Sequence, residues 1–154
     1  MKIVIFALSI IFATLSAQAA KLESYAGKQP HVLLKSASDF AKAYRAAIRE
    51  VELPTWTKRL AAGQSAEIVD IGGSKQILTS ACGKGGCLDE RIYILFDAGT
   101  KTATGFFFLP PAADNPADSR TAFSQWFGKP AKEATDFLLE RAVNDAHSLN
   151  TPKN

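Results

Sequence analysis

The chain has few of the residues that usually carry metal or redox chemistry. Its 154 residues include two Cys, two His and one Met. His31 and His147 lie far apart in the sequence, and neither has a second metal ligand at helical spacing beside it. A zinc cluster needs several such ligands at short spacing, so the sequence excludes one, and we expect neither a metal nor another cofactor.

The sequence also lacks an excess of charge of one sign. It contains 18 Lys and Arg against 15 Asp and Glu, a formal net charge of +3, and it has no run of five basic residues. Nucleic-acid-binding domains and polybasic membrane anchors usually show such an excess or such a run, so we expect no nucleic acid as partner. Repeats, low-complexity tracts and long linkers are absent as well, which indicates a single domain.

The longest apolar run stands at the front of the chain. Ile3–Leu15 follows Lys2, contains no charged residue and precedes Ala17-Gln18-Ala19. This pattern is typical of a secretory signal peptide, and the run is too short to span a membrane comfortably. We interpret residues 1–19 as a signal peptide and residues 20–154 as the mature domain, which is periplasmic and free of the membrane after cleavage.

Helical periodicity is clearest in two parts of the mature chain. Residues 20–35 are polar and contain breakers, so they are expected to form an irregular arm. A helix is predicted from Ser36 or Ser38 to about Val51, where apolar side chains recur at helical spacing. Two more helices are predicted further on: a short one capped by Asp118 that carries Phe123, Trp126 and Phe127, and a long one from Pro130 to about Ala146.

The middle of the chain has the residue pattern of β-strands. Ala66–Ile71 and Lys75–Ala81 flank Gly72-Gly73, a pair that suits a tight hairpin turn. Arg91–Phe96 and Ala103–Leu109 form a second predicted hairpin, and their continuous apolar runs indicate cover on both faces. The sequence therefore predicts an α+β fold, a central antiparallel β-sheet with flanking helices.

The two cysteines lie between these predicted hairpins. In an oxidising compartment two cysteines permit one intramolecular bridge, so we expect Cys82 and Cys87 to form a disulfide. They enclose Gly83-Lys84-Gly85-Gly86, a small loop with one positive charge. Three uses stay open from the residues alone: a preorganised recognition loop, a stapled turn without a partner, and a redox site. The spacing C-x4-C, in place of C-x-x-C, disfavours the last.

Residues suited to catalysis are scarce. Asp89 and Glu90 are adjacent, so in a strand they point to opposite faces, and a solvated turn is their expected place. Ser74 and Ser80 have no identified histidine partner. We therefore expect that the protein is not an enzyme. A slender cationic loop instead suits a narrow cleft lined by carboxylates, as in glycoside hydrolases that cut peptidoglycan.

Several short segments, taken in order, resemble one protein family. Leu53-Pro54-Thr55-Trp56 comes first, Ser80-Ala81-Cys82 and Cys87 frame the loop, and Arg91-Ile92 and Thr104-Gly105-Phe106-Phe107 follow. With the preceding signal peptide, this order resembles the inhibitor of vertebrate lysozyme family, called Ivy. The resemblance implies a central antiparallel sheet with helices packed on it. It also implies that the partner is a C-type lysozyme or a lytic transglycosylase, and that the protein is a monomer or a homodimer.

The same resemblance implies a role for the loop. In inhibitory members a disulfide-closed loop, typically Cys-Lys-Pro-His-Asp-Cys, enters the lysozyme active site, where its histidine engages the catalytic carboxylates. This chain has Gly85 in place of that histidine, and Gly83, Lys84 and Gly86 at the other loop positions. The long Lys84 side chain is expected to reach a carboxylate in place of the imidazole.

Two functions are therefore expected from the sequence. The first is a periplasmic inhibitor that inserts the Cys82–Cys87 loop into the active-site cleft of a peptidoglycan-cleaving enzyme. The second is a non-inhibitory Ivy-fold module that binds another envelope partner, for example through Trp56 or Trp126. Packing in the core or in an interface is the more common use of such tryptophans.

Overall fold

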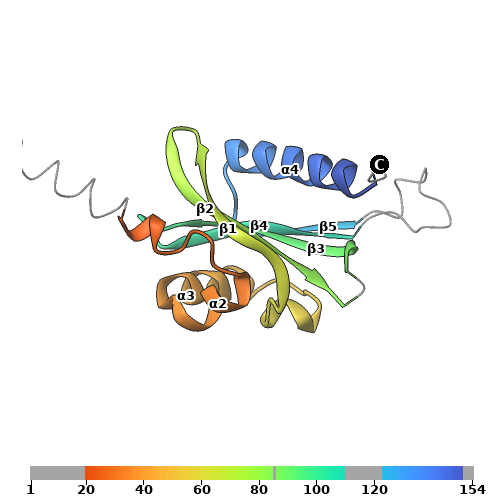
Figure 1. The fold of residues 1–154 in the computed structure, drawn as a ribbon, viewed down its shortest axis with the longest axis horizontal. Helices are drawn as coiled ribbons and strands as arrows, with labels where there is room; N and C mark the ends of the chain where they lie inside the picture. Colours follow the sequence, from red (N-terminus) through yellow and green to blue (C-terminus); the bar gives the residue numbers. More distant parts are fainter. Residues whose placement is uncertain (1–19, 85, 110–122, 151–154) are drawn as a thin grey trace, which may run out of the picture.

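The computed structural model describes residues 20–84, 86–109 and 123–150, which form a five-stranded antiparallel sheet between helices on both faces (Figure 1). The strands lie in chain order: β1 (Ala62–Ile71), β2 (Ser74–Gly83), β3 (Gly86–Asp97), β4 (Thr102–Leu109) and β5 (Phe123–Phe127). The helices are α2 (Pro30–Ser36), α3 (Ser38–Ala47), the 3-10 helix η1 (Thr55–Lys58) and α4 (Lys132–Asn150). The predicted α+β class is confirmed. The predicted signal peptide, residues 1–19, lies outside the described residues.

Both predicted hairpins are confirmed. β1 and β2 turn at Gly72 and Gly73, whose φ angles of 59° and 81° lie in the left-handed region that favours glycine. β3 and β4 pair from Arg91 opposite Phe108 to Asp97 opposite Thr102. Strand pairing therefore joins elements that are neighbours along the chain, and no crossover is needed within the sheet.

One face of the sheet is covered by α2 and α3. Phe40 and Tyr44 lie one turn apart on α3, and both are fully buried. The Phe40 ring meets the Phe96 ring of β3 edge to face, with 5.6 Å between centroids. Alternate residues of β3, including Ile92 and Ile94, complete this core.

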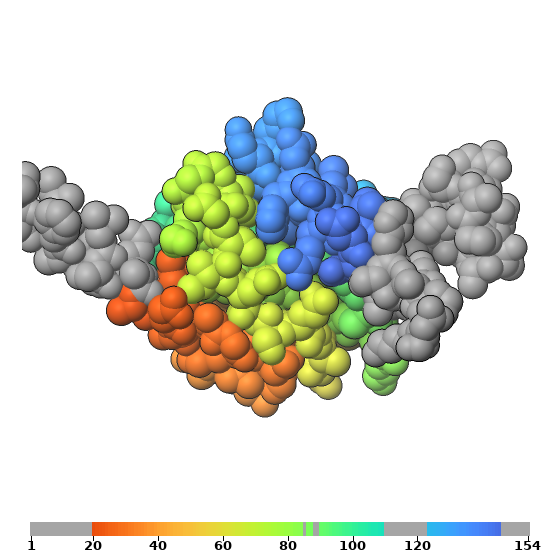
Figure 2. All heavy atoms as spheres, turned by 45° about the horizontal axis from the view of Figure 1, so that its top comes forward, coloured from red at the N-terminus to blue at the C-terminus, as the bar shows by residue number. Residues whose placement is uncertain are grey.

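The opposite face is covered by α4. Ala134 and Leu138 are buried against Tyr93, Leu95 and Phe106 of the sheet. Figure 2 shows α4, in blue, lying across this side of the molecule beside the β1–β2 hairpin. β3 is thus buried on both faces, as its continuous apolar run predicted.

The predicted irregular arm at residues 20–35 is wrong. Residues 20–23 are helical, and α2 begins at Pro30. Proline is well suited to the first turn of a helix, where its missing N–H is not required, so it starts this helix instead of breaking it. Leu22 and Leu33 are buried in the core on the α2–α3 side, which explains why the segment is ordered against the sheet. The next helix, α3, ends at Ala47, before the predicted end at Val51.

The predicted short helix that carries Phe123, Trp126 and Phe127 is also wrong. These residues belong to β5, which pairs with β4 from Gly105 opposite Phe127 to Leu109 opposite Phe123. Aromatic residues favour strands. Without β5, the edge of β4 would expose unpaired backbone N–H and C=O groups, and pairing with Phe123–Phe127 satisfies them. The proposed cap, Asp118, lies outside the described residues.

A buried ion pair holds α4 to the sheet. Arg91 Nη1 donates to Asp145 Oδ2 at 2.6 Å, and the two side chains are 5% and 13% exposed. Arg91 also donates to the Tyr93 hydroxyl at 2.9 Å, and that hydroxyl donates to Asp145 Oδ2 at 3.1 Å. Arg141 binds Asp145 Oδ1 at 3.2 Å and Glu67 of β1 at 2.7 Å, so one helix is tied to two strands.

Replacing Asp145 with alanine should leave the Arg91 charge buried without its carboxylate. We expect the free energy of unfolding to fall by about 3 kcal/mol, measured by urea denaturation. The matched control is Asp136→Ala, which removes the exposed pair with Lys132 on the same helix and should cost less than about 1 kcal/mol. Equal losses in the two variants would contradict the assigned role of Asp145.

Burial in the same cluster raises the pKa of Tyr93 from 10.0 to about 12, against the opposing effect of the Arg91 guanidinium. A raised pKa means that the folded state favours the neutral phenol, so the free energy of unfolding should fall as pH rises from 10 to 12. Tyr93→Phe should make this fall shallower. Burial also raises the pKa of Tyr44, so part of the fall should persist. Urea midpoints across this pH range measure the effect, and identical slopes in both proteins would refute it.

Candidate functional site: the tip of the β2–β3 hairpin

The predicted disulfide is confirmed. Cys82 of β2 and Cys87 of β3 are bonded, with their Cα atoms 4.8 Å apart. The bond lies at the end of the hairpin that joins these strands, where Gly83 pairs with Gly86. It closes a loop at the tip of a long ribbon, so the two strands carry the loop out from the sheet (Figure 1).

The pairing of the two strands changes register at this tip. Cys82 lies opposite Arg91, whereas the next residue, Gly83, lies opposite Gly86. Residues 87–90 therefore have no counterparts in β2, and they form an irregular extension of β3. The disulfide ties the first residue of this extension back to β2, which fixes the tip against the regular part of the hairpin.

The glycines of the tip have separate local roles. Gly86 has a φ of 106°, a conformation that residues with a Cβ atom rarely adopt. Gly83 lies against Glu90, where an added Cβ atom would approach Glu90 Oε2 to 2.8 Å. These two glycines thus permit a tight turn with little bulk. Gly85 lies outside the described residues.

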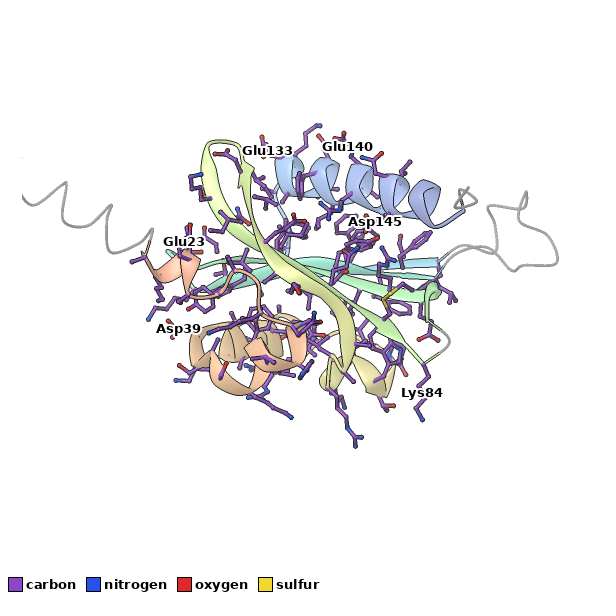
Figure 3. All side chains as sticks on the ribbon, in the orientation of Figure 1. Glu23, Asp39, Lys84, Glu133, Glu140 and Asp145 are labelled. Carbon is purple, nitrogen blue, oxygen red and sulfur yellow. A yellow bond between two sulfur atoms is a disulfide. The ribbon has the colours of Figure 1, made fainter. Side chains whose placement is uncertain are left out.

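Lys84 is the charged residue of the tip. It is exposed, and Figure 3 shows its side chain pointing away from the sheet, on the side where α2 and α3 lie. Within the described part of the chain, Lys84 has no ion-pair partner. Its ammonium group is therefore free to meet an anionic group on another molecule.

Trp56 supports the base of the tip. Its indole N–H donates to Glu90 Oε2, and its ring lies 6.3 Å from the Phe107 ring. The helix that carries it, η1, is held to α3 by the buried Tyr44 hydroxyl, which donates to the Thr57 carbonyl at 3.0 Å. The expectation that Asp89 and Glu90 form a solvated turn is wrong for Glu90, which is half-buried in β3 because the indole N–H gives it a partner. The Asp89 side chain lies outside the described residues.

A groove of about 350 Å³ runs beside the tip, between it and η1. Trp56, Arg59 and Lys84 are among its lining residues, so two cations and one aromatic ring share one concave surface. Such a surface suits a ligand that carries carboxylates. Sequence reasoning found Lys84 and Trp56 but missed Arg59, because nothing in the local sequence shows that η1 packs next to the tip.

The other sequence candidates lie elsewhere. His31 belongs to α2 and His147 to α4, whose two cores are on opposite faces of the sheet. Ser80 donates to Gln64 Oε1 at 3.0 Å inside the sheet, and Trp126 stacks on Phe106 with 4.7 Å between ring centroids. Ser74 begins β2 at the far end of the hairpin. The side chains of His31, Ser74, Ser80 and Trp126 do not line the groove beside the tip, and the His147 side chain lies outside the described residues.

No family model and no curated protein matches this sequence. Among the described residues, no group of three His, Cys, Asp or Glu side chains is placed to hold a metal ion. In the same residues, no helix combines the length and the apolar character that crossing a membrane requires. The tip and its groove are therefore the candidate site on the strength of their geometry.

Removing the disulfide should cost little stability because the closed loop is short. For a sequence separation of 5, the Cys82→Ala/Cys87→Ala variant should lose about 2 kcal/mol in the free energy of unfolding. Urea denaturation measures the loss, and far-ultraviolet circular dichroism should show an unchanged sheet. A reductant should destabilise the wild-type protein by the same amount and leave the variant unchanged. Global unfolding of the variant would show that the bond supports more than the tip.

Proposed function

We propose that this protein is a periplasmic inhibitor of the Ivy type, which inserts the Cys82–Cys87 tip into the active-site cleft of a C-type lysozyme or a related peptidoglycan-cleaving enzyme. The observation that carries the proposal is the disulfide-closed tip with its exposed, unpaired Lys84. The antiparallel sheet with helices on both faces agrees with the fold that the resemblance implies. The protein acts by occupying the cleft and performs no chemistry itself.

The chemistry of such a cleft favours a cationic tip. Glycoside hydrolases hold two carboxyl groups on either side of the scissile bond, and at least one carries a negative charge. Lys84 presents a compact positive charge on a flexible stem, and Gly83 and Gly86 keep the backbone beside it slender. An ammonium–carboxylate contact in a site that excludes water is worth about 2 kcal/mol, or more than tenfold in affinity.

Restraints on the loop before binding offset part of the affinity that is lost with the histidine and the proline of the inhibitory loop. Glycine adds conformational freedom that binding must remove, and the loop lacks the proline typical of the family. The disulfide and the Trp56–Glu90 hydrogen bond restrain the base of the tip before any partner arrives. Arg59 supplies a second cation at the rim of the groove.

A second candidate function is a non-inhibitory module of the same fold that binds another envelope partner. The observation that favours it is the glycine at position 85, where the inhibitory loop carries its histidine. Of the two tryptophans considered for such binding, Trp56 borders the tip groove, and Trp126 stacks on Phe106. The groove beside the tip is therefore the surface to test for that partner as well.

Lys84→Ala should weaken inhibition by about tenfold because the variant loses the charge that meets the cleft carboxylates. The measurement is the inhibition constant of the oxidised mature protein against a C-type lysozyme, from the clearing of a cell-wall suspension. Lys75→Ala is the matched control, since Lys75 lies near the opposite end of the β2 strand. Its inhibition constant should equal that of the wild type.

Two results would contradict the proposal. If the wild-type protein leaves lysozyme active at tens of micromolar, the target is not a C-type lysozyme, and lytic transglycosylases should be assayed next. If wild type and Lys84→Ala inhibit equally, the inhibitor does not act through the tip. A pull-down from periplasmic extract that recovers no lysozyme-fold enzyme would favour the non-inhibitory module.

A further inference from the structure

A second groove, of about 660 Å³, lies between α2, α3 and η1. Its lining includes five basic side chains from these three elements and the residue after η1. Together with the lysine of the tip groove, they form a surface that we call the basic band: Lys35, Lys42, Arg45, Lys58, Arg59 and Lys84. All six side chains are exposed.

Local structure brings these residues together. Lys42 and Arg45 are three positions apart on α3, so they are neighbours on its outer surface, while Tyr44 points into the core. The Tyr44 hydroxyl in turn binds the Thr57 carbonyl, which fixes η1 and its end residue Lys58 beside α3. The sequence shows no run of basic residues because the band is assembled from separate segments.

One carboxylate, that of Glu52, lines a neighbouring pocket together with Arg45 and Lys58. Within the described residues, neither groove has an Asp or Glu in its lining, and no side chain of the band takes part in an ion pair. Other lysines of the protein are paired: Lys21 contacts Asp39 at 2.7 Å, and Lys101 contacts the same carboxylate at 3.6 Å. The described linings of the two grooves thus carry charge of one sign, on a chain whose net charge is only +3.

Part of the acidic charge of the protein lies away from the band. Outside the band, acidic residues outnumber basic residues in the sequence. Figure 3 shows Glu133 and Glu140 on α4, on the opposite side of the sheet from Lys84. A local patch of positive charge attracts an anionic partner and raises the rate of encounter with it.

The two grooves adjoin. Arg59 and Ala61 line both of them, so their basic residues together reach from Lys84 at the tip to Lys35 on α2. A surface of this length and sign suits an extended anionic chain better than a single compact anion. An extended chain places successive charges along the band, and each contact adds to the others.

We propose that the basic band binds a linear acidic polysaccharide. A glycan chain carries its acidic groups at regular intervals and lies in a groove without deep burial. The tip groove adds Trp56, a half-buried aromatic ring whose face suits contact with a sugar ring. Glycan binding can be tested separately from inhibition by the tip, because most residues of the band belong to α2, α3 and η1 and not to the tip.

The structure favours a glycan over the other common polyanions. Proteins that bind single-stranded nucleic acid stack successive bases on several aromatic rings, but among the described lining residues of the two grooves Trp56 is the only Phe, Tyr or Trp. Proteins that bind membranes insert apolar side chains beside their cations. The large hydrophobic residues that are exposed in the described chain are Leu109, Phe123, Leu139 and Val143, and none of them lines either groove.

The test measures binding of the oxidised mature protein to a fluorescent oligomer of polygalacturonate by anisotropy. We expect saturable binding that weakens as salt is added, and no binding to neutral dextran. The variant Lys42→Gln/Lys58→Gln should raise the Kd about tenfold or more. The control Lys75→Gln/Lys132→Gln removes the same charge outside the band and should change the Kd less than about twofold, since the Lys132 pair is exposed.

Three results would overturn the proposal: no saturable binding of polygalacturonate at low salt, equal losses in the band variant and the control variant, or tighter binding to single-stranded oligothymidine or to phosphatidylglycerol vesicles. Lysozyme inhibition by the Lys42→Gln/Lys58→Gln variant is measured in parallel. The variant leaves the tip intact, so a failure of glycan binding and a failure of inhibition are separate outcomes.

Discussion

The pairing of β2 with β3 is the constraint on which the rest of the structure depends. In this hairpin Ile77 lies opposite Phe96 and Cys82 opposite Arg91. Because β3 is buried on both faces, a slip of one residue would send its side chains to the wrong core: Tyr93 would face α3, and Ile94 would face α4. The same register sets Arg91 beneath Asp145 and places the disulfide at the end of the ribbon. Core packing therefore also positions the candidate site.

The sequence was most informative where the signal is local. The Gly72-Gly73 turn and the continuous apolar runs predicted β1 to β4, and the pair of cysteines predicted the closed tip. Pro30 was misleading because proline, which interrupts helices, is also common in their first turn. The segment Phe123–Phe127 was misassigned because its apolar positions fit one face of a helix as well as a strand. Contacts between distant segments were out of reach: Arg91 meets Asp145 across 54 positions, and Trp56 meets Glu90 across 34. The basic band has the same origin, although the outward spacing of Lys42 and Arg45 on α3 was a visible sign of it.

The two proposals use the same side of the molecule for different purposes. The tip presents one cation on a narrow, restrained support, which suits a cleft. The band presents several cations over a broad, shallow surface, which suits a chain. Arg59 borders both grooves, so an occupant of one lies next to the other. Under the two proposals, an acidic polymer and a target enzyme would bind next to each other on this side of the molecule.

The N-terminal segment has a consequence for solubility as well as for the core. β1 is an edge strand, and it carries an irregularity between Gln64 and Glu67. At that point the Gly27 N–H donates to the Ala66 carbonyl at 2.8 Å, and the Ala66 N–H donates to the Lys28 carbonyl at 2.8 Å. The backbone N–H and C=O groups of Ala66, with which a strand of another molecule would pair, are therefore already hydrogen-bonded. The irregularity also bends β1, so that its edge is less regular for pairing on either side. Gly27 and Lys28 thus protect the β1 edge of the sheet from edge-to-edge aggregation.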